Sequence, residues 1–296
     1  MVRGAAAPPG ACAVNPILVT DPADPRLADY VGLTDRDLRR RMEVEGGRGL
    51  FIAEGVLVIG ELLRSPFPVR SVLVTAARHA QLADRLRGLS APVFVAEHEV
   101  MKAVTGFDIH RGAVAAADRL PLATLTDLSR GAQRVAVLEG LNDHENLGVI
   151  FRNAAAFGID AVVLDPSCAD PLYRRSVRVS MGHVLRVPFT RAEHWPGALD
   201  DLARLGFEVV ALTPRRGAQP VETLDRFRGG GRVALVVGSE GPGLSDEALR
   251  SAATSVRIGM ADGVDSLNVA AAAAVAFHRI AAPGGPISAP EHRCGP

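Results

Sequence analysis

Lysine is almost absent from this sequence, since Lys102 is the only one in 296 residues. A phosphate-binding loop ends in Gly-Lys-Ser or Gly-Lys-Thr, so that class of nucleotide site is excluded. Cysteine is also scarce: Cys12, Cys168 and Cys294 are isolated, and none lies in C-x-x-C spacing. We therefore expect no zinc or other metal site, no disulfide framework, and a reducing compartment.

The sequence also lacks a net charge and a long apolar run. Its 33 Lys and Arg residues balance 33 Asp and Glu residues, so any nucleic-acid surface must come from local arginine clusters. No stretch approaches the roughly 18 apolar residues of a membrane span. The first residues lack the apolar core of a signal peptide. We expect a soluble, cytoplasmic protein with disordered tails at residues 1–20 and 283–296.

An apolar content of 48% is ample for the cores of one large domain or two smaller ones. Helix and strand patterns alternate over residues 21–117, which predicts a small α/β domain. The expected elements are helices at 34–45, 56–63, 78–86 and 97–104, and strands at 50–53, 69–75, 92–95 and 112–117. Residues 118–132 are expected to form a linker with a short helix at 122–128.

A second α/β domain is predicted over residues 133–282. Its expected strands alternate with helices, which indicates a largely parallel sheet with buried strands. These strands are predicted at 135–138, 161–164, 184–188, 208–212, 233–237 and 255–258. Ligands in such sheets bind beyond the carboxyl ends of the strands, so the loops that follow the last three are expected to converge.

A glycine-rich loop, Gly238-Ser-Glu-Gly-Pro-Gly243, follows one of these apolar runs directly. Glycines there permit positive φ and a close approach of the backbone to a ligand. The G-x-x-G-x-G spacing differs from the G-x-G-x-x-G of dinucleotide-binding proteins, which argues against a nucleotide-dependent oxidoreductase. Taken alone, the loop is also compatible with a tight turn from strand to helix.

Two polar segments accompany the loop. The first runs from Asn146 through Arg152 to Gly158, with apolar residues at helical spacing and a glycine where the helix should end. The second, Ser266-Leu267-Asn268, opens an alanine-rich helix. A simple structural explanation for Ser266 is that it caps this helix.

Together the three segments resemble the three sequence motifs of the SpoU (TrmH) group, within the SPOUT superfamily of RNA 2'-O-ribose methyltransferases. Asn146 and Arg152 match the first motif, the loop with Glu240 the second, and Ser266 with Asn268 the third. The resemblance covers residues of about 130 to 282. It implies a SPOUT domain with a mostly parallel sheet and a deep trefoil knot, an exception to the rule that chains avoid knots. It also implies a homodimer formed through the knotted domain.

The resemblance further implies that S-adenosylmethionine binds in the knot, largely through main-chain groups. The implied cofactor-binding residues are Leu212, Thr213, Gly238, Gly241, Gly243, Ile258, Met260 and Leu267. For Leu212 and Thr213, packing at the end of a strand is the alternative.

The implied catalytic set is Arg152, Asn146, Glu240, Ser266 and Asn268. In the family, the arginine is often described as activating the 2'-hydroxyl. Because arginine stays protonated, we expect it to stabilise the developing alkoxide while a substrate phosphate or water takes the proton. Asn146 and Asn268 offer amide donors and acceptors, which are suited to holding Arg152, the ribose or the loop backbone in position. Glu240 is expected to organise the site through hydrogen bonds to neighbouring loops or to Asn146, with a general base as the alternative.

The segments around Arg48 and Arg111 are similar to the ribosomal-protein-like RNA-binding domain that precedes the catalytic domain in many SpoU proteins. Both arginines are candidates for RNA contact, with surface charge or a salt bridge to Glu54 as the alternative. Three more candidates for holding RNA phosphates are Arg174, Arg175 and Arg178.

The sequence thus predicts methylation of a ribose 2'-hydroxyl in structured RNA. The extra N-terminal domain favours ribosomal RNA over tRNA as the substrate. A non-catalytic RNA-binding protein that keeps the knot stays open as an alternative, as does a resistance enzyme acting on ribosomal RNA.

Overall fold

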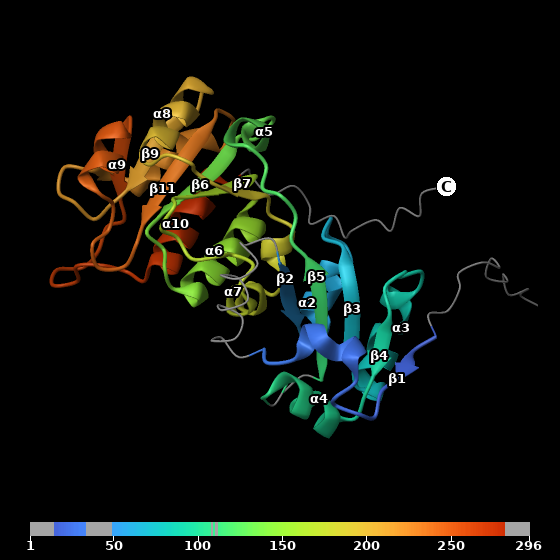
Figure 1. Cartoon of the computed structure of the whole chain (residues 1–296). Coiled ribbons are helices and arrows are strands. Elements are labelled where there is room, and N and C mark those ends of the chain that lie inside the picture. The colour runs from blue at the N-terminus through green and yellow to red at the C-terminus, as the bar shows by residue number, and fades with distance from the viewer. Residues whose placement is uncertain (1–14, 34–48, 108, 110–111, 282–296) are drawn as a thin grey trace, which may run out of the picture. The chain divides into compact units, whose positions relative to one another are not determined.

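The computed structural model describes residues 15–33, 49–107, 109 and 112–281, and the chain divides into two compact units, Met1–Leu120 and Pro121–Pro296 (Figure 1). The helix expected at 34–45 and the expected C-terminal tail lie outside the described residues. Arg48 and Arg111 lie outside them as well. The prediction of a disordered tail over residues 1–20 is wrong for Ile17 and Leu18, which form a strand.

The first unit contains a five-stranded sheet. Its strand order is β1 (Ile17–Leu18), β4 (Val93–Val95), β3 (Val69–Val74), β5 (Ala113–Asp118) and β2 (Leu50–Glu54). The first three run parallel, whereas β5 is antiparallel to both of its neighbours. Among the described residues of this unit, the helical elements are η1 (Pro25–Tyr30), α2 (Val56–Leu62), α3 (Ala76–Leu86) and α4 (His98–Thr105). The elements predicted between residues 50 and 117 lie within two residues of these bounds.

The second unit contains a seven-stranded sheet in which every strand pair is parallel. Its strand order is β10 (Gln219–Pro220), β12 (Thr254–Arg257), β9 (Glu208–Leu212), β11 (Val233–Gly238), β6 (Arg134–Glu139), β7 (Ala161–Leu164) and β8 (Phe189–Arg191). All six residues of the central strand β11 are buried. Burial on both faces is typical of a parallel sheet covered by helices, so the predicted α/β class is confirmed.

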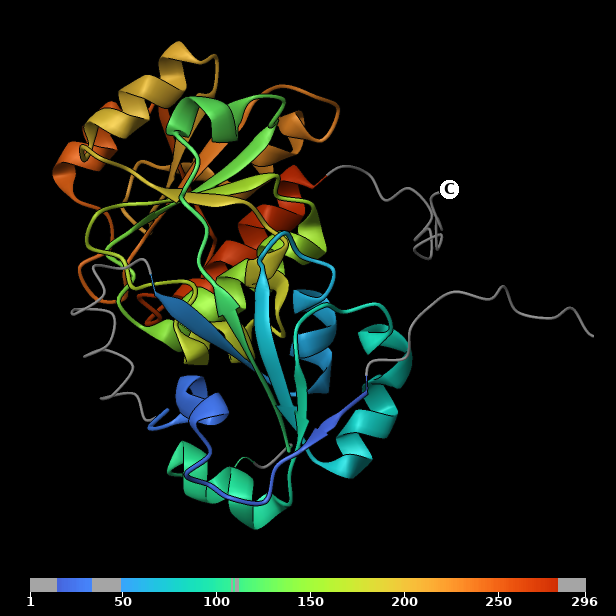
Figure 2. The ribbon, with the colours of Figure 1, turned by 45° about the vertical axis from the view of Figure 1, so that its right-hand side comes forward.

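Helices cover both faces of this sheet. On one face lie α5 (Leu125–Ser129), α8 (Gly197–Arg204) and α9 (Asp246–Ser251), whose apolar side chains share a buried cluster with alternate strand residues. On the other face lie α6 (His144–Phe157), α7 (Arg174–Val179) and α10 (Val269–Ile280) (Figures 1 and 2). The last of these packs against α6 and against η3 (Val221–Phe227). Two helices that carry predicted motifs, α6 and α10, are therefore direct neighbours.

Local chemistry sets the ends of these two helices. Asp143 caps α6 by accepting a hydrogen bond from the backbone of Asn146 at 2.7 Å, and Gly158 ends it in the left-handed conformation with φ 67°. The alternative explanation for Ser266, that it caps α10, is wrong. The side-chain oxygen of Asn268 accepts from the backbone N–H groups of Ala270 and Ala271, so the cap lies two residues later.

The strand predicted at 184–188 is also wrong. Residues His183–Leu185 form the short helix η2, and the strand begins at Phe189. The backbone N–H groups of Leu185, Arg186 and Val187 donate to carbonyls of Gly182 and His183, so they cannot pair with a neighbouring strand. The short helix expected at 122–128 begins later, after Thr124, which caps it. No helix of the described part of the chain is long and apolar enough to cross a membrane.

Candidate active site

One pocket in the second unit, of about 300 Å³, lies where loops leave the carboxyl ends of β9, β11 and β12 and meet the start of α10. Its lining consists of Leu212, Thr213, Pro214, Val237, Gly238, Ser239, Glu240, Gly241, Gly243, Leu244, Ile258, Met260, Ser266, Leu267, Asn268, Val269 and Ala272. The predicted convergence of the three loops is confirmed. All eight residues expected to bind the cofactor lie on this lining, together with Glu240, Ser266 and Asn268.

The glycine loop closes tightly on itself. A Cβ atom placed on Gly238 would lie 2.4 Å from the carbonyl carbon of Gly243 and 2.5 Å from the nitrogen of Leu244. Gly241 and Gly243 have φ of 85° and 72°, a region that other residues rarely adopt. The backbone N–H of Gly243 donates to the carbonyl of Ser239 at 3.1 Å. The loop therefore presents main-chain groups to the pocket, and it needs glycine at several positions to do so.

Asn268 joins the three motifs. Its Nδ2 donates to Asn146 Oδ1 at 2.9 Å and to Glu240 Oε1 at 2.8 Å, while its Oδ1 caps α10. The amide is thus used on both sides, as a donor toward the site and as an acceptor toward the helix. Glu240 Oε1 also accepts from the backbone N–H of Val269 at 3.5 Å, and it is linked to Asn146 through Asn268. Ser266 is exposed on the pocket lining.

Arg152 is exposed on α6 and does not line the pocket. It has no hydrogen-bond or ion-pair partner among the described residues. The next residue, Asn153, donates from Nδ2 to the carbonyl of Ala270 at 2.9 Å, which ties α6 to the first turn of α10. The guanidinium group is therefore carried on a fixed helix while its own five donors remain available to a ligand.

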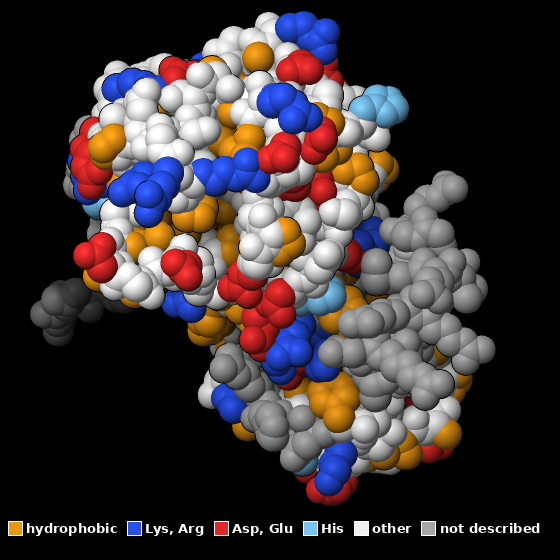
Figure 3. Space-filling view, turned by 90° about the vertical axis from the view of Figure 1, so that its left-hand side faces the viewer, with side chains coloured by type: hydrophobic (Ala, Val, Ile, Leu, Met, Phe, Trp, Pro, Cys, Tyr) orange, Lys and Arg blue, Asp and Glu red, His pale blue; other side chains and the backbone are white. Residues whose placement is uncertain are grey.

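The three arginines of α7 differ in their surroundings. Arg175 and Arg178 are exposed, whereas Arg174 is half-buried. Arg175 donates from Nε and Nη2 to Glu145 Oε1 at 3.0 and 2.5 Å. Exposed ion pairs of this kind contribute little to stability. On the face of the molecule seen in Figure 3, basic and acidic side chains are interspersed, with no broad field of one sign.

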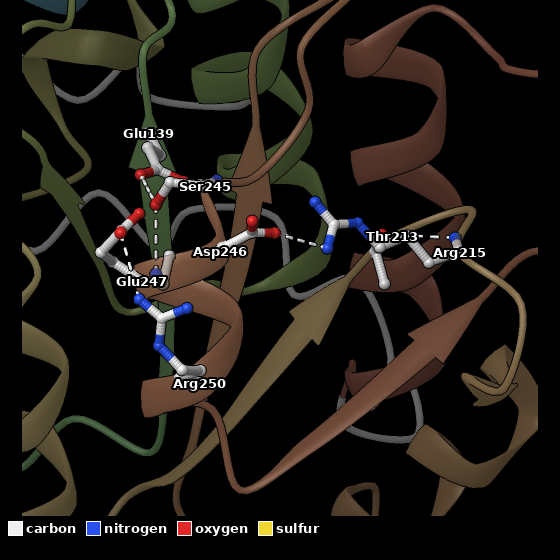
Figure 4. Close-up of polar contacts among 8 residues, drawn as sticks. Glu139, Thr213, Arg215, Ser245, Asp246, Glu247 and Arg250 are labelled. Carbon is white, nitrogen blue, oxygen red and sulfur yellow. Dashed lines mark hydrogen bonds and ion pairs between the residues drawn. The ribbon is translucent and has the colours of Figure 1, made fainter.

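An ion pair lies beside the pocket. Arg215 Nη1 is 2.7 Å from Asp246 Oδ1, and this hydrogen bond lowers the pKa of Asp246 (Figure 4). The backbone N–H of Arg215 donates to Oγ1 of Thr213, which lines the pocket. The pair thus joins the loop after β9 to the first residue of α9.

Sequence reasoning missed Glu139, a buried carboxylate at the end of β6. It accepts a hydrogen bond from Trp195 Nε1 at 2.7 Å. It also accepts from Ser245 Oγ at 2.6 Å and from Ser245 N at 3.0 Å (Figure 4). The signal in the sequence is an acidic residue at the end of a strand that otherwise consists largely of aliphatic residues.

Cys168 is buried next to the loop that precedes α6. Its thiol donates to the carbonyl of Leu138, and the backbone N–H of Leu141 donates to Sγ, both at 3.3 Å. Burial, with a smaller contribution from Asp165, raises the pKa of Cys168 from 9.0 to about 12. The reactive thiolate is therefore scarce at neutral pH.

We expect Cys168 to resist thiol reagents in the folded protein. In a variant with Cys12→Ser and Cys294→Ser, the thiol should react at pH 8 at least about a hundredfold more slowly than in denaturant, because both burial and the raised pKa disfavour the thiolate. Absorbance of a released aromatic thiolate measures the rate. Comparable rates in the two states would contradict the buried position.

Comparison with known proteins agrees with the motifs. The model of the SpoU rRNA Methylase family matches residues 133–278. An uncharacterised tRNA/rRNA methyltransferase of Mycobacterium tuberculosis is 50% identical over 260 residues, which cover 88% of this chain and 90% of that protein. A 23S rRNA (guanosine-2'-O-)-methyltransferase of Nitrosomonas europaea is 30% identical over 226 residues, 74% of this chain and 85% of that protein.

A solved structure supports the same assignment. The AdoMet-bound rRNA methyltransferase from Sinorhizobium meliloti superposes with a TM-score of 0.73 at 27% identity, over 89% of this chain and 96% of that one. The resemblance inferred from the three motifs is confirmed. The chain belongs to the SpoU family of rRNA methylases.

Proposed function

We propose that this protein transfers a methyl group from S-adenosylmethionine to a ribose 2'-hydroxyl in RNA. The observation that carries the proposal is the hydrogen-bonded bridge of Asn268 to Asn146 and Glu240, which brings all three motifs to the edge of one pocket. The relative from Nitrosomonas europaea is named for 2'-O-methylation of 23S rRNA, and the structure from Sinorhizobium meliloti holds AdoMet. Both support this reaction and this cofactor.

The pocket suits a ligand with an apolar ring and few charges. Leu212, Ile258, Met260 and Leu267 supply aliphatic surface, while the glycine loop offers main-chain donors and acceptors. Thr213, Gly238, Gly241 and Gly243 complete the proposed set. When bound, the cofactor supplies an electrophilic methyl group on a sulfonium. The wall residues would hold its adenine and orient that methyl toward the incoming ribose.

In this reaction the 2'-oxygen would take the methyl group as the carbon–sulfur bond of the cofactor breaks, so the residues of the site would have to hold the ribose and the cofactor in a fixed relative position. Arg152 would donate hydrogen bonds to the oxygen as negative charge develops on it. The proton leaves to a substrate phosphate or to water. Asn146, Asn268, Ser266 and Glu240 would fix the ribose and the loop, since the amide of Asn268 already connects the first two motifs.

RNA would be held by arginines outside the pocket. Those of α7, Arg174, Arg175 and Arg178, can contact phosphates, as can Arg48 and Arg111 of the N-terminal part. We assign residues 21–117 to binding of substrate RNA, 118–132 to the linker and 133–282 to methyl transfer. The additional domain favours ribosomal RNA as the substrate. A single-stranded loop whose ribose can turn outward is the expected target.

The proposed domain would be knotted and dimeric. The segment between β12 and α10 returns past the glycine loop, where Asn268 contacts Glu240, before α10 packs on α6. This path suits a C-terminal knot. Val264, Leu267 and Val275 are exposed by 49%, 42% and 38%, and they offer apolar surface to a second copy.

The test is transfer of labelled methyl from S-adenosylmethionine to unmodified total RNA and to ribosomal subunits, followed by mapping of ribose methylation by resistance to alkali. We expect label at a discrete 2'-oxygen. Binding of RNA and cofactor with no transfer to any of these substrates would instead support a non-catalytic RNA-binding protein.

Asn268 provides a second test, because its two roles can be separated. Asn268→Ala should lower the free energy of unfolding by about 1 kcal/mol through loss of the helix cap. Asn268→Asp keeps a capping oxygen, but it loses the Nδ2 donor and sets a second carboxylate against Glu240. Both variants should therefore lose about tenfold or more of the activity, since neither can donate to Asn146 and Glu240 as the amide of Asn268 does. Denaturant titration and the methylation assay measure the two effects; wild-type activity of Asn268→Asp would refute the bridge.

A further inference from the structure

Glu139 is a buried carboxylate that has no role in the proposed reaction. Its carboxylate is 8% exposed and does not line the pocket. Three donors converge on it. One is the indole N–H of Trp195. The other two are the hydroxyl and the backbone N–H of Ser245 (Figure 4). A buried carboxylate is costly unless its hydrogen bonds are satisfied, and these three bonds satisfy it.

The direction of the bond from Ser245 is fixed by its neighbours. Its hydroxyl oxygen accepts from the backbone N–H of Ala248 at 3.1 Å, as the cap of α9. Its single proton therefore goes to Glu139 Oε1, 2.6 Å away. Among the described residues, no Lys, Arg or His side chain donates to the carboxylate. The contacts therefore fix the positions of Ser245 and Trp195 and do not neutralise the charge of Glu139.

Glu139 touches both ends of the glycine loop. Its backbone lies in register with Gly238, the last residue of β11, while its side chain holds Ser245, the second residue after the loop. The next residue, Gly140, has φ 68°, and a Cβ there would lie 3.3 Å from Oγ of Ser239. The end of β6 therefore pairs with the first residue of the glycine loop and also holds Ser245, just beyond the last residue of the loop, by hydrogen bonds.

We propose that Glu139 is a positioning residue that keeps the glycine loop in the shape that binds the cofactor. The inference rests on the proposed function, since the loop is assigned there to S-adenosylmethionine. If Glu139 no longer fastens Ser245, only a fraction of molecules has the loop in place, and the apparent dissociation constant rises as that fraction falls. Molecules that do bind keep the same reacting groups.

Glu139→Gln tests this with little change of size. The glutamine amide retains one acceptor oxygen, but its NH2 group takes the place of the other oxygen. That NH2 group then faces a donor from Trp195 or Ser245, with which it cannot form a hydrogen bond. We expect the dissociation constant of S-adenosylmethionine, measured by calorimetry, to rise about tenfold, while kcat at saturating cofactor stays within about twofold. The matched control is Glu247→Gln on α9, whose exposed carboxylate contacts only Arg250 at 3.1 Å and should leave both values unchanged.

Two readouts do not depend on activity. Trp195 is the only tryptophan, so its emission reports directly on the environment of Glu139 and should change in Glu139→Gln but not in Glu247→Gln. Hydrogen exchange of the amides at residues 239–245 should be about tenfold faster in Glu139→Gln. The exchange measurement needs no cofactor. It therefore decides the role of Glu139 even if the wild-type protein binds no S-adenosylmethionine, an outcome that would refute the proposed function instead.

The inference is overturned if folded Glu139→Gln binds the cofactor with unchanged affinity and shows unchanged exchange in the loop. A fall in kcat with no change in affinity would overturn it as well. If Glu139→Gln does not fold, Ser245→Ala decides, because it removes one donor and leaves the carboxylate in place. Affinity and loop exchange of Ser245→Ala within twofold of the wild type would then refute the proposal.

Discussion

Arg152→Ala is expected to lower kcat for methyl transfer by about 10²- to 10³-fold, which is the typical effect of removing one donor to a developing oxyanion. Arg152 does not line the pocket, so the affinity for S-adenosylmethionine should stay within about twofold. The loss should therefore appear in single-turnover rates with saturating cofactor and RNA. Because the side chain is exposed and has no partner among the described residues, the free energy of unfolding should hardly change.

Two further variants sharpen this prediction. Arg152→Lys keeps the charge but loses the planar, forked donors, and it should recover only part of the lost rate. Arg250→Ala on α9 removes another exposed helical arginine, one paired with Glu247 and outside the pocket lining, and should be as active as the wild type. Full activity of Arg152→Lys would contradict a geometric role for the guanidinium. Full activity of Arg152→Ala would remove Arg152 from the mechanism.

The convergence of the pocket loops could be predicted from the sequence because it follows from a local pattern. Apolar runs such as Val233–Val237 predict buried parallel strands, and parallel strands place their carboxyl ends along one edge. Every loop that leaves that edge is then a candidate for the site. The identity of the bound molecule and the role of Arg152 needed the resemblance to a family, since spacing alone specifies neither.

Contacts between residues far apart in the sequence could not be predicted. Glu139 and Ser245 are 106 positions apart, and Glu139 and Trp195 are 56 apart. No local pattern relates them. Only the placement of β6 beside β11 brings the carboxylate to the end of the glycine loop.

Local errors arose where two explanations fit the same residues. Ser266 and Asn268 are both good capping residues, and only the backbone path shows that α10 starts after Asn268. The apolar run at 184–188 suits a buried strand as well as a buried turn. Hydrogen bonds back to Gly182 and His183 select the turn. In the second case the burial of Val184, Leu185 and Val187 was apparent from the sequence, whereas their conformation was not.

Gly238→Ala is expected to lower the affinity for S-adenosylmethionine by about 10- to 100-fold. The added Cβ would lie 2.4 to 2.6 Å from the backbone of Gly243 and Leu244, and backbone atoms cannot move aside as the end of a flexible side chain can. Overpacking of this kind costs about 1–3 kcal/mol. The loop can relieve the clash only by opening, which moves the main-chain groups proposed to bind the cofactor. Calorimetric titration measures the loss.

Gly229→Ala is the matched control, because a Cβ there meets nothing within 4 Å and its φ is not positive. It should bind S-adenosylmethionine like the wild type. Gly238→Ala should also lower the midpoint of thermal unfolding. Added cofactor should raise that midpoint less than in the wild type, since stabilisation by a ligand grows with the logarithm of its concentration divided by its dissociation constant. A Gly238→Ala protein with normal affinity would mean that the closed loop is not the shape that binds. Both the assignment of the pocket to the cofactor and the role given to Glu139 would then lose their structural basis.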